Sequence, residues 1–417
     1  AQLKASRASG VFLFPGQGSQ YAGMGAELYA AEPVYRQVID RVAAALADDG
    51  GLGIDLRDYL LWSPERSSRP RAEVDRELSQ TRLAQPAIFA VEVATAALLA
   101  DWGLRPTALL GHSVGELAAA QVAGMVELEV AARLVATRGR LMQSMAPGRM
   151  LAVRAAEQRF AALLDADVVV AARNAPELTV VSGPAAAIAG LARRLAENGI
   201  EASELVTSHA FHSPSMAPAA ADLVAAFAAA PFAASSLPIF STALGAENTA
   251  AAMRGADYWG QQLLRPVLFA DAVVAAVTKE PQTIFVEVGP GQSLASLARL
   301  VVKPLGAPPV FSCLGPVQAP GSDLDNLIAA AGRCWLHGIR PDWTKFNAGR
   351  RQRVALPTYP FTRKRHWVEP HKLALAGARG DADAGTPRDA TPTSSAPLVT
   401  VAAAANENES EVETLVK

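Results

Sequence analysis

The stretch from residue 108 to residue 120 reads ALLGHSVGELAAA. Its apolar residues 108–110 predict a buried strand, the sequence Gly-His-Ser-Val-Gly predicts a sharp turn, and residues 116–120 favour a helix. A serine on such a strand–turn–helix junction has an exposed hydroxyl, and the helix N-terminus and the amide of Val114 favour developing negative charge. The stretch therefore predicts that Ser113 is a nucleophile. The alternative is an ordinary serine in a glycine-rich turn.

Strands and helices alternate on both sides of this stretch. Short apolar runs that end in turn residues predict strands, and longer segments with apolar residues at helical spacing predict helices. Such alternation is typical of a mostly parallel sheet, so the expected fold class is α/β. In the expected large subdomain, strands cover 11–14, 108–110, 237–241 and 283–288, helices cover 87–102 and 293–302, and a solvated loop covers 63–77.

Residues 149–207 form a separate pattern. The predicted order is strand, helix, strand, strand, helix, strand, which is the βαββαβ order of ferredoxin-like units. We therefore expect a small ferredoxin-like subdomain inserted into an α/β-hydrolase-like large subdomain with a parallel sheet. The expected strands are 150–153, 168–172, 178–182 and 200–206, the helices are 157–164 and 186–198, and a turn covers 174–177.

Composition and charge exclude several classes of protein. Half of the 417 residues are hydrophobic and 19% are charged, which excludes a chain that is disordered as a whole. The formal net charge of −2 provides no basic field for nucleic acid. The two cysteines, Cys313 and Cys334, predict neither a disulfide framework nor a clustered zinc site, and no metal site is expected.

No segment is expected to cross a membrane. The most apolar helical stretch, residues 84–104, contains Pro86, Glu92 and Asp101, whereas a span needs about 20 predominantly apolar residues. The first residues lack the apolar region of a signal peptide. A soluble protein is therefore the expectation, and the use of only two cysteines fits a reducing, cytoplasmic setting.

A serine nucleophile needs a base, which is most often a histidine. Of the six histidines, His209 and His212 lie together in the sequence Ser-His-Ala-Phe-His, and on the residues alone either is also acceptable as a loop histidine. His112 lies on the turn itself, so its ring is expected to point away from the hydroxyl of Ser113. The residues alone therefore predict a Ser–His acyl-transfer or hydrolase site and leave the acyl group and the acceptor open. They favour a solvated helix-face arginine at Arg138.

Seven motifs, in order along the chain, together resemble one enzyme family. They are FPGQGSQ at 14–20, TRLAQPA at 81–87, GHSVGE at 111–116, RGRLMQ at 138–143, NAP at 174–176, HAFH at 209–212 and EVGPG at 287–291. The combination, over about residues 8–305, resembles the malonyl-CoA:acyl carrier protein acyltransferases, above all the acyltransferase domain of modular type I polyketide synthases. The sequence LPTYPFTRKRHW at 356–367 resembles the linker that follows this domain in those synthases.

The resemblance implies a role for each candidate residue. Ser113 would be the nucleophile and His212 the general base, oriented by backbone carbonyls rather than by a carboxylate. The amides of Gln17 and Val114 would form the oxyanion hole. Arg138 would pair with the free carboxylate of the acyl group, since a guanidinium binds a carboxylate through two charge-assisted hydrogen bonds. The other residues implied to line the site are Gln85, His112, Asn174, His209 and Phe211.

The same resemblance implies a two-step exchange. Malonyl-CoA would acylate Ser113, and the phosphopantetheine thiol of an acyl carrier protein would then take the malonyl group, so no cofactor is bound. The HAFH motif and Val114 are typical of malonyl-specific members, and a bulky Phe211 would leave little room for the extra methyl group of methylmalonyl. A single methyl group is worth about 1–3 kcal/mol, so we expect a preference for malonyl with some leakage.

The resemblance also implies how the chain is organised. The large subdomain would comprise residues 8–148 and 208–305, the small subdomain 149–207, the linker 306–370, and a flexible tail 371–417 that could begin the next domain. The implied partners are a carrier protein and the ketosynthase and linker domain of the same synthase. Contact with these domains explains the basic residues of the linker, so neither nucleic acid nor a membrane is expected as a partner.

Three other functions remain open on the sequence. A serine esterase or thioesterase would hydrolyse its ester and would not need Arg138. A malonyltransferase of fatty-acid synthesis would use the same site, although the segment 356–367 favours a type I synthase. A docking or scaffold fragment without activity is opposed by the presence of Ser113, His212 and Gln17.

Overall fold

The computed structural model describes residues 9–48, 51–248, 252–315 and 322–347, together with residues 355, 357, 358 and 361. The tail predicted at 371–417 and most of the linker motif at 356–367 lie outside the described residues. The chain divides into two compact units, and the fold below belongs to the unit that contains residues 9–347.

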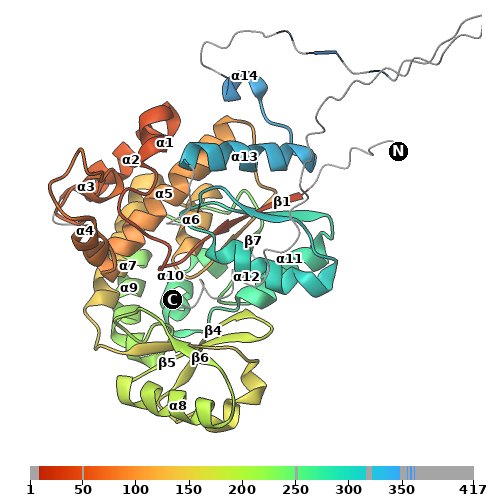
Figure 1. Cartoon of the computed structure of the whole chain (residues 1–417). Coiled ribbons are helices and arrows are strands. Elements are labelled where there is room, and N and C mark those ends of the chain that lie inside the picture. The colour runs from red at the N-terminus through yellow and green to blue at the C-terminus, as the bar shows by residue number, and fades with distance from the viewer. Residues whose placement is uncertain are drawn as a thin grey trace, which may run out of the picture. The chain divides into compact units, whose positions relative to one another are not determined.

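A six-stranded sheet forms the centre of the large subdomain (Figure 1). Its strand order is β10-β9-β1-β2-β7-β8, and neighbouring strands are parallel except for β7 and β8. The strands are β1 (Ser9–Phe14), β2 (Ala108–Gly111), β7 (Ile239–Ser241), β8 (Ala246–Glu247), β9 (Thr283–Glu287) and β10 (Val310–Ser312). β1 and β2 are buried along nearly their whole length, as is typical of parallel strands covered by helices. The predicted α/β class is confirmed.

Helices pack against this sheet and connect its strands. α6 contacts β1 and β2, α12 contacts β1, β9 and β10, and α11 contacts β7. The helices outside the small subdomain are α1 (Ala26–Ala31), α2 (Pro33–Leu46), α3 (Arg57–Leu60), α4 (Arg71–Leu78), α5 (Thr81–Asp101), α6 (Gly115–Val122), α7 (Leu128–Gln143), α9 (Ala217–Ala228), α10 (Ala256–Leu264), α11 (Phe269–Lys279), α12 (Ser293–Val302), α13 (Asp323–Leu336) and α14 (Trp343–Phe346). Short 3₁₀ turns lie at η3 (Pro214–Met216), η4 (Ala252–Arg254) and η5 (Lys303–Leu305).

The long apolar helix α5 crosses the core. It begins at Thr81 rather than at the predicted residue 87, and it runs through Pro86, where the missing amide hydrogen leaves one helical hydrogen bond unmade. By length and apolar composition it is the one described helix that could span a membrane. However, 89% of its most apolar window is buried within the protein, as expected of a core helix.

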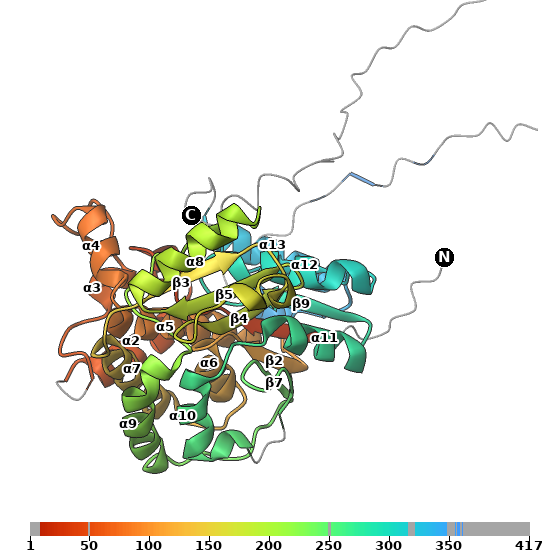
Figure 2. The ribbon, with the colours of Figure 1, turned by 90° about the horizontal axis from the view of Figure 1, so that it is seen from below.

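A four-stranded antiparallel sheet of order β4-β5-β3-β6 forms the small subdomain (Figures 1 and 2). Its elements are β3 (Arg149–Val153), η1 (Glu157–Arg159), η2 (Ala161–Leu163), β4 (Val169–Ala175), β5 (Leu178–Gly183), α8 (Ala185–Glu197) and β6 (Ala202–Glu204). Side chains alternate between the two faces of a strand. On β3, Leu151 and Val153 join the core under α8, whereas Met150 and Ala152 join the core of the large subdomain. The sheet is therefore held between α8 and the large subdomain.

Backbone hydrogen bonds join the two subdomains at two places. Where the chain enters and leaves the small subdomain, the amide of Gly148 donates to the carbonyl of Ser208 at 3.1 Å. Along β4, the amide of Val267 donates to Ala171 at 2.9 Å, and its carbonyl accepts from Arg173 at 2.8 Å. The small subdomain is thus attached by main-chain groups as well as by packing.

The charged segment predicted as a loop at 63–77 is partly helical. α4 covers Arg71–Leu78, so the prediction is wrong for most of its second half. Val74 and Leu78, four residues apart, are buried on one face of this helix. The two apolar residues are outnumbered by five charged ones, which concealed the helical period.

Two predictions within the small subdomain were also wrong in part. The segment predicted as a helix at 157–164 forms the 3₁₀ turns η1 and η2, which meet at Phe160. The φ angle of Phe160, −132°, lies outside the helical range, and its side chain is fully buried. β4 extends to Ala175, so Asn174 belongs to this strand, and the hairpin turn is shorter than predicted.

Two carboxyl groups, those of Glu92 on α5 and Glu287 on β9, are fully buried in the core. Glu287 accepts hydrogen bonds from the amides of Leu294 and Ala295 at 3.1 and 2.7 Å. Among the described residues neither oxygen of Glu92 has a hydrogen-bond partner. Burial, and then the charge of Glu287, raises the pKa of Glu92 well above its usual value, and burial raises the pKa of Glu287 to about 7.

These two groups make stability depend on pH. A carboxyl group with a raised pKa in the folded state keeps a proton that the unfolded chain releases. The contribution of these two groups to the free energy of unfolding is therefore largest below the unfolded value of 4.5, and it falls as the pH rises to about 7, where Glu287 ionises, and beyond.

We expect the substitution Glu92→Gln to remove part of this pH dependence. The amide is neutral at every pH, so the variant gains stability relative to the wild type as the pH rises. The gain is about 1.4 kcal/mol per pH unit until the pKa of Glu92 is passed. Urea unfolding of both proteins between about pH 5 and pH 8 measures the difference. A difference that stays constant with pH would contradict this assignment.

Candidate active site

Ser113 lies on a sharp turn between β2 and α6. Its φ angle of 54° is in the left-handed region. A Cβ atom on Gly115 would lie 2.2 Å from the carbonyl oxygen of Phe14, and one on Gly111 would lie 2.2 Å from the amide of Glu116. Only glycine fits at these two positions, and the backbone can therefore reverse within a few residues beyond the end of β2.

The hydroxyl of Ser113 is paired with His212. The distance between Ser113 Oγ and His212 Nε2 is 2.8 Å. His212 Nδ1 lies 3.1 Å from the carbonyl oxygen of Gln262 and 3.0 Å from that of Arg265. Because carbonyl oxygens only accept, Nδ1 carries the ring proton and Nε2 is free to take the proton of the serine. Two carbonyls thus occupy the position that a carboxylate has in a hydrolase triad.

Both members of this pair have a strained backbone. Among the described residues, the non-glycine residues with positive φ are Ser113 at 54°, His212 at 56° and Ala307 at 49°. Each such conformation costs about 1–3 kcal/mol and persists only where the surrounding structure enforces it. Strain at both partners indicates that their relative position is held by the fold.

Arg138 on α7 is a buried cation in contact with the pair. It is 1% exposed, so the solvated helix-face arginine favoured by the residues alone is wrong. Nη1 donates to Gln85 Oε1 at 2.8 Å, and Nη2 donates to Ser113 Oγ at 3.1 Å and to Gln262 Oε1 at 3.3 Å. Its Nε has no partner among the described residues. The guanidinium therefore has capacity for an anion next to Ser113.

The charges of the site favour a neutral base beside a cation. Burial lowers the pKa of Arg138 to about 10, and the negative charge of Glu116 opposes this shift, so Arg138 is charged at neutral pH. Burial, and then the charge of Arg138, lowers the pKa of His212 to about 3. His212 is therefore neutral near pH 7, which is the form that accepts a proton.

Two backbone amides near Ser113 are free to donate. Val114 directly follows the serine, and a Cβ atom on Gly16 would lie 3.0 Å from the carbonyl oxygen of His112, so the loop that carries Gln17 lies against the turn. Within the described part of the chain, neither the amide of Gln17 nor that of Val114 donates to an acceptor. Free amides of this kind are the donors that an oxyanion requires.

The profile of the acyl transferase domain family matches residues 11–315. The chain belongs to this family. Polyketide synthase GfsB of Streptomyces halstedii is 39% identical over 384 residues, which are 89% of this chain and 6% of that protein. The chain spans between 6% and 22% of the length of three curated relatives that it matches.

Solved structures agree with this assignment. The acyltransferase domain from the second module of the salinomycin polyketide synthase shares 38% identity and a TM-score of 0.74, covering 86% of this chain and 81% of that one. The malonyl CoA-acyl carrier protein transacylase of Coxiella burnetii shares 27% identity and a TM-score of 0.65, covering 79% and 98%. The family resemblance seen in the motifs is therefore confirmed.

The other predicted residues of this acyl transferase domain lie around the pair. His112 Nε2 lies 3.1 Å from Asn174 Oδ1, and this contact links the turn to β4 of the small subdomain. Burial lowers the pKa of His112. His209 and Phe211 are buried with ring centroids 5.8 Å apart, and His209 Nδ1 lies 2.7 Å from Ser208 Oγ. Ser113 is thus hydrogen-bonded directly to His212 and Arg138. No direct hydrogen bond to Ser113 is formed by the other four described residues, His112, Asn174, His209 and Phe211.

Gln262 on α10 was missed by sequence analysis. Its backbone carbonyl orients His212, and its side-chain Nε2 donates to the carbonyl of Ser113 at 2.8 Å. It lies 149 residues from Ser113 in the sequence, and no motif spacing points to it. The acyl transferase domain therefore contains a central polar residue that only the folded structure identifies.

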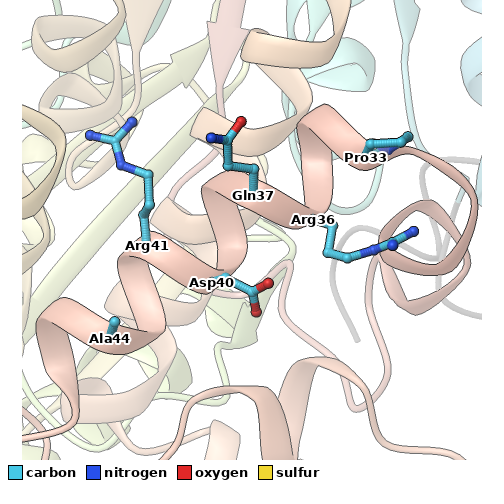
Figure 3. A pocket seen from close by; sticks show the side chains of 6 residues that line it. All are labelled: Pro33, Arg36, Gln37, Asp40, Arg41 and Ala44. Atoms are coloured by element: carbon cyan, nitrogen blue, oxygen red, sulfur yellow. The ribbon is translucent and has the colours of Figure 1, made fainter.

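One surface hollow among the described residues is lined by charged side chains that already have partners. A surface hollow of about 420 Å³ on α2 is lined by Pro33, Arg36, Gln37, Asp40, Arg41 and Ala44 (Figure 3). Its charges already have partners, since Asp40 pairs with Arg57 and Arg41 pairs with Glu129, both at 2.8 Å. No group of three or more metal-ligating side chains occurs among the described residues.

Proposed function

We propose that this acyl transferase domain moves a malonyl group from malonyl-CoA to Ser113 and then to the phosphopantetheine thiol of an acyl carrier protein. The observation that carries the proposal is the buried guanidinium of Arg138, 3.1 Å from Ser113 Oγ. A buried charge is costly unless it is paired. The free carboxylate of a malonyl group on Ser113 would pair with it, whereas an acyl group without a carboxylate would not.

In the first step Ser113 is acylated. His212 Nε2 takes the proton of Ser113 Oγ while the oxygen attacks the carbonyl carbon of the thioester. The negative charge that develops on the carbonyl oxygen is stabilised by the amides of Gln17 and Val114. The carbon–sulfur bond then breaks, the CoA sulfur leaves with the proton held by His212, and a malonyl-serine ester remains.

In the second step the acyl group leaves Ser113. His212 takes the proton of the carrier thiol, and its sulfur attacks the ester carbonyl. The bond to Ser113 Oγ breaks, and this oxygen recovers the proton from His212. The exchange is ping-pong, and water has to be kept from the ester between the steps. A buried His212 and Arg138 support such exclusion.

A serine esterase or thioesterase is the second candidate, because it would use the same turn and the same Ser–His pair. Arg138 favours the transferase, since hydrolysis of a neutral ester does not need a buried cation at the nucleophile. Polyketide rather than fatty-acid assembly is supported by relatives named as polyketide synthases. The proposed partners are therefore a carrier protein and the ketosynthase of the same synthase, in the cytoplasm.

Intact-protein mass spectrometry tests the proposal. Brief incubation with malonyl-CoA should add one malonyl group to the wild type and none to Ser113→Ala. Addition of pantetheine or a phosphopantetheinylated carrier protein should remove the group and acylate the thiol. Methylmalonyl-CoA should load less, because we propose that the bulky Phe211, next to His212 in the sequence and buried, excludes the extra methyl group. Release of CoA without an adduct or acylated thiol would indicate a hydrolase and overturn the proposal.

A further inference from the structure

Glu116 is a fully buried carboxylate on the first turn of α6, three residues after Ser113. Its Oε1 accepts hydrogen bonds from the amide and the hydroxyl of Thr242 at 2.6 and 2.7 Å. Its Oε2 accepts from the hydroxyl of Tyr258 at 2.5 Å and from Gln262 Nε2 at 3.0 Å. The amide of Thr242 and Nε2 of Gln262 can only donate, and they bind different oxygens of Glu116, which matches a carboxylate whose two oxygens both accept.

Gln262 connects this carboxylate to the cation of the site. The two hydrogens of its amide group are directed to Glu116 Oε2 at 3.0 Å and to the carbonyl of Ser113 at 2.8 Å. Its Oε1 is therefore left to accept from Arg138 Nη2 at 3.3 Å. Rotation of a side-chain amide by half a turn exchanges the positions of its oxygen and its nitrogen. For Gln262 the nitrogen has to face the two acceptors, Glu116 Oε2 and the Ser113 carbonyl, so only the observed orientation fits. Glu116 and the carbonyl of Ser113 thus together fix which end of Gln262 faces Arg138.

Arg138 has no carboxylate in direct contact among the described residues. Its hydrogen-bond partners are Gln85, Ser113 and Gln262, all of them neutral. Glu116 supplies a negative charge from one amide group away, and this charge raises the pKa of Arg138 against the effect of burial. A carboxylate in direct contact would occupy the guanidinium hydrogens that a substrate carboxylate needs.

We propose that Glu116 is a positioning residue for recognition of the acyl carboxylate. Acting through Gln262, it holds Arg138 toward Ser113 and balances the buried cation without occupying it. The inference rests on the proposed function and identifies what prepares Arg138 for a malonyl-type group. This role differs from stabilisation of the Ser113 turn alone. A residue that only stabilised the turn would affect the loading of every acyl group equally.

Two substitutions test this role. Glu116→Gln has the same shape but no charge, and its NH2 group can replace one of the two acceptors that hold the amide of Gln262. Gln262→Met removes the connection and leaves the backbone carbonyl that orients His212. In both variants the second-order rate of malonyl loading from malonyl-CoA should fall about 10- to 100-fold. Acetyl loading from acetyl-CoA, which brings no carboxylate, should change by less than about 3-fold in Glu116→Gln. Gln262→Met also removes the hydrogen bond to the Ser113 carbonyl, so for this variant the expected result is a fall in the ratio of malonyl to acetyl loading.

The controls are chosen to isolate recognition of the carboxylate. Glu129→Gln makes the same chemical change on α7, at an exposed side chain paired with Arg41, and should keep the wild-type ratio of malonyl to acetyl loading. Arg138→Ala gives the ratio for complete loss of carboxylate binding. Circular dichroism reports whether each variant is folded, and Gln262→Met decides the test if Glu116→Gln is unfolded.

The outcomes separate the inference from the proposed function. A selective fall in malonyl loading supports it. An equal fall for both acyl groups would assign Glu116 to the turn alone and overturn the inference, as would an unchanged ratio. A wild type that loads acetyl but not malonyl would overturn the proposed function instead.

Discussion

Replacement of His212 by alanine should slow acylation of Ser113 by malonyl-CoA about 10²- to 10⁴-fold. The imidazole Nε2, 2.8 Å from Ser113 Oγ, is the group placed to take the serine proton, and two carbonyls hold the ring in the required tautomer. Timed mass spectrometry of the malonyl adduct measures the rate, with Ser113→Ala as the zero. A rate within about 3-fold of the wild type would show that another group removes the proton.

The pH profile of the same reaction provides an independent check. A general base is active in its neutral form, so the rate falls only as the pH drops through its pKa. Because burial and then Arg138 lower the pKa of His212 to about 3, loading should stay nearly constant from pH 8 down to about pH 5. A fall centred on the ordinary histidine value of 6.5 would contradict this electrostatic description.

Replacement of Arg138 by alanine should reduce malonyl loading about 10²- to 10⁴-fold and leave acetyl loading intact or faster. Two charge-assisted hydrogen bonds to the acyl carboxylate would be lost, each worth about 1.5–3 kcal/mol. Arg138→Lys keeps the charge without the two-pronged geometry and should lie between the alanine variant and the wild type. Parallel assays with malonyl-CoA and acetyl-CoA measure the selectivity, and equal losses for both would remove Arg138 from carboxylate recognition.

The alanine variant should also shift the pH profile. Arg138 is a cation close to His212, and its charge is one cause of the lowered pKa of that histidine. Without it the pKa of His212 rises, so the low-pH fall in acetyl loading should move to a higher pH than in the wild type. An unmoved profile would mean that burial alone determines the pKa of His212.

The local pattern around Ser113 was predictable because its determinants are close together in the sequence. An apolar run, two glycines and a helix-forming segment occupy only residues 108–120, and each has a specific steric role in the turn. The helix at Ser293–Val302 was predicted with its observed ends because its apolar residues keep a regular period. By contrast, α4 was missed because charged residues dominate a helix with a narrow buried face.

The polar network behind the site was not predictable from the sequence. Glu116 and Gln262 are 146 residues apart, and neither differs by type from the many surface residues of the same kind. The solvated arginine favoured at Arg138 was wrong because its buried surroundings come from α5, α6 and α10, which only the fold brings together. Residues that neutralise one another over such long sequence separations show no periodic pattern and no fixed spacing. Only the three-dimensional structure therefore identifies them.

The main-chain attachment of the small subdomain has a consequence for building chimaeras. An exchange of residues 149–207 with those of a relative leaves Val267 behind, yet its hydrogen bonds to Ala171 and Arg173 use only backbone groups. Any donor segment with a strand of matching length can therefore restore that connection whatever its side chains. The bond from His112 Nε2 to Asn174 Oδ1 is different, because it depends on one particular side chain. A graft that retains this asparagine would keep the contact between β4 and the turn that carries Ser113, so that the other side chains of the small subdomain can be exchanged on an intact scaffold.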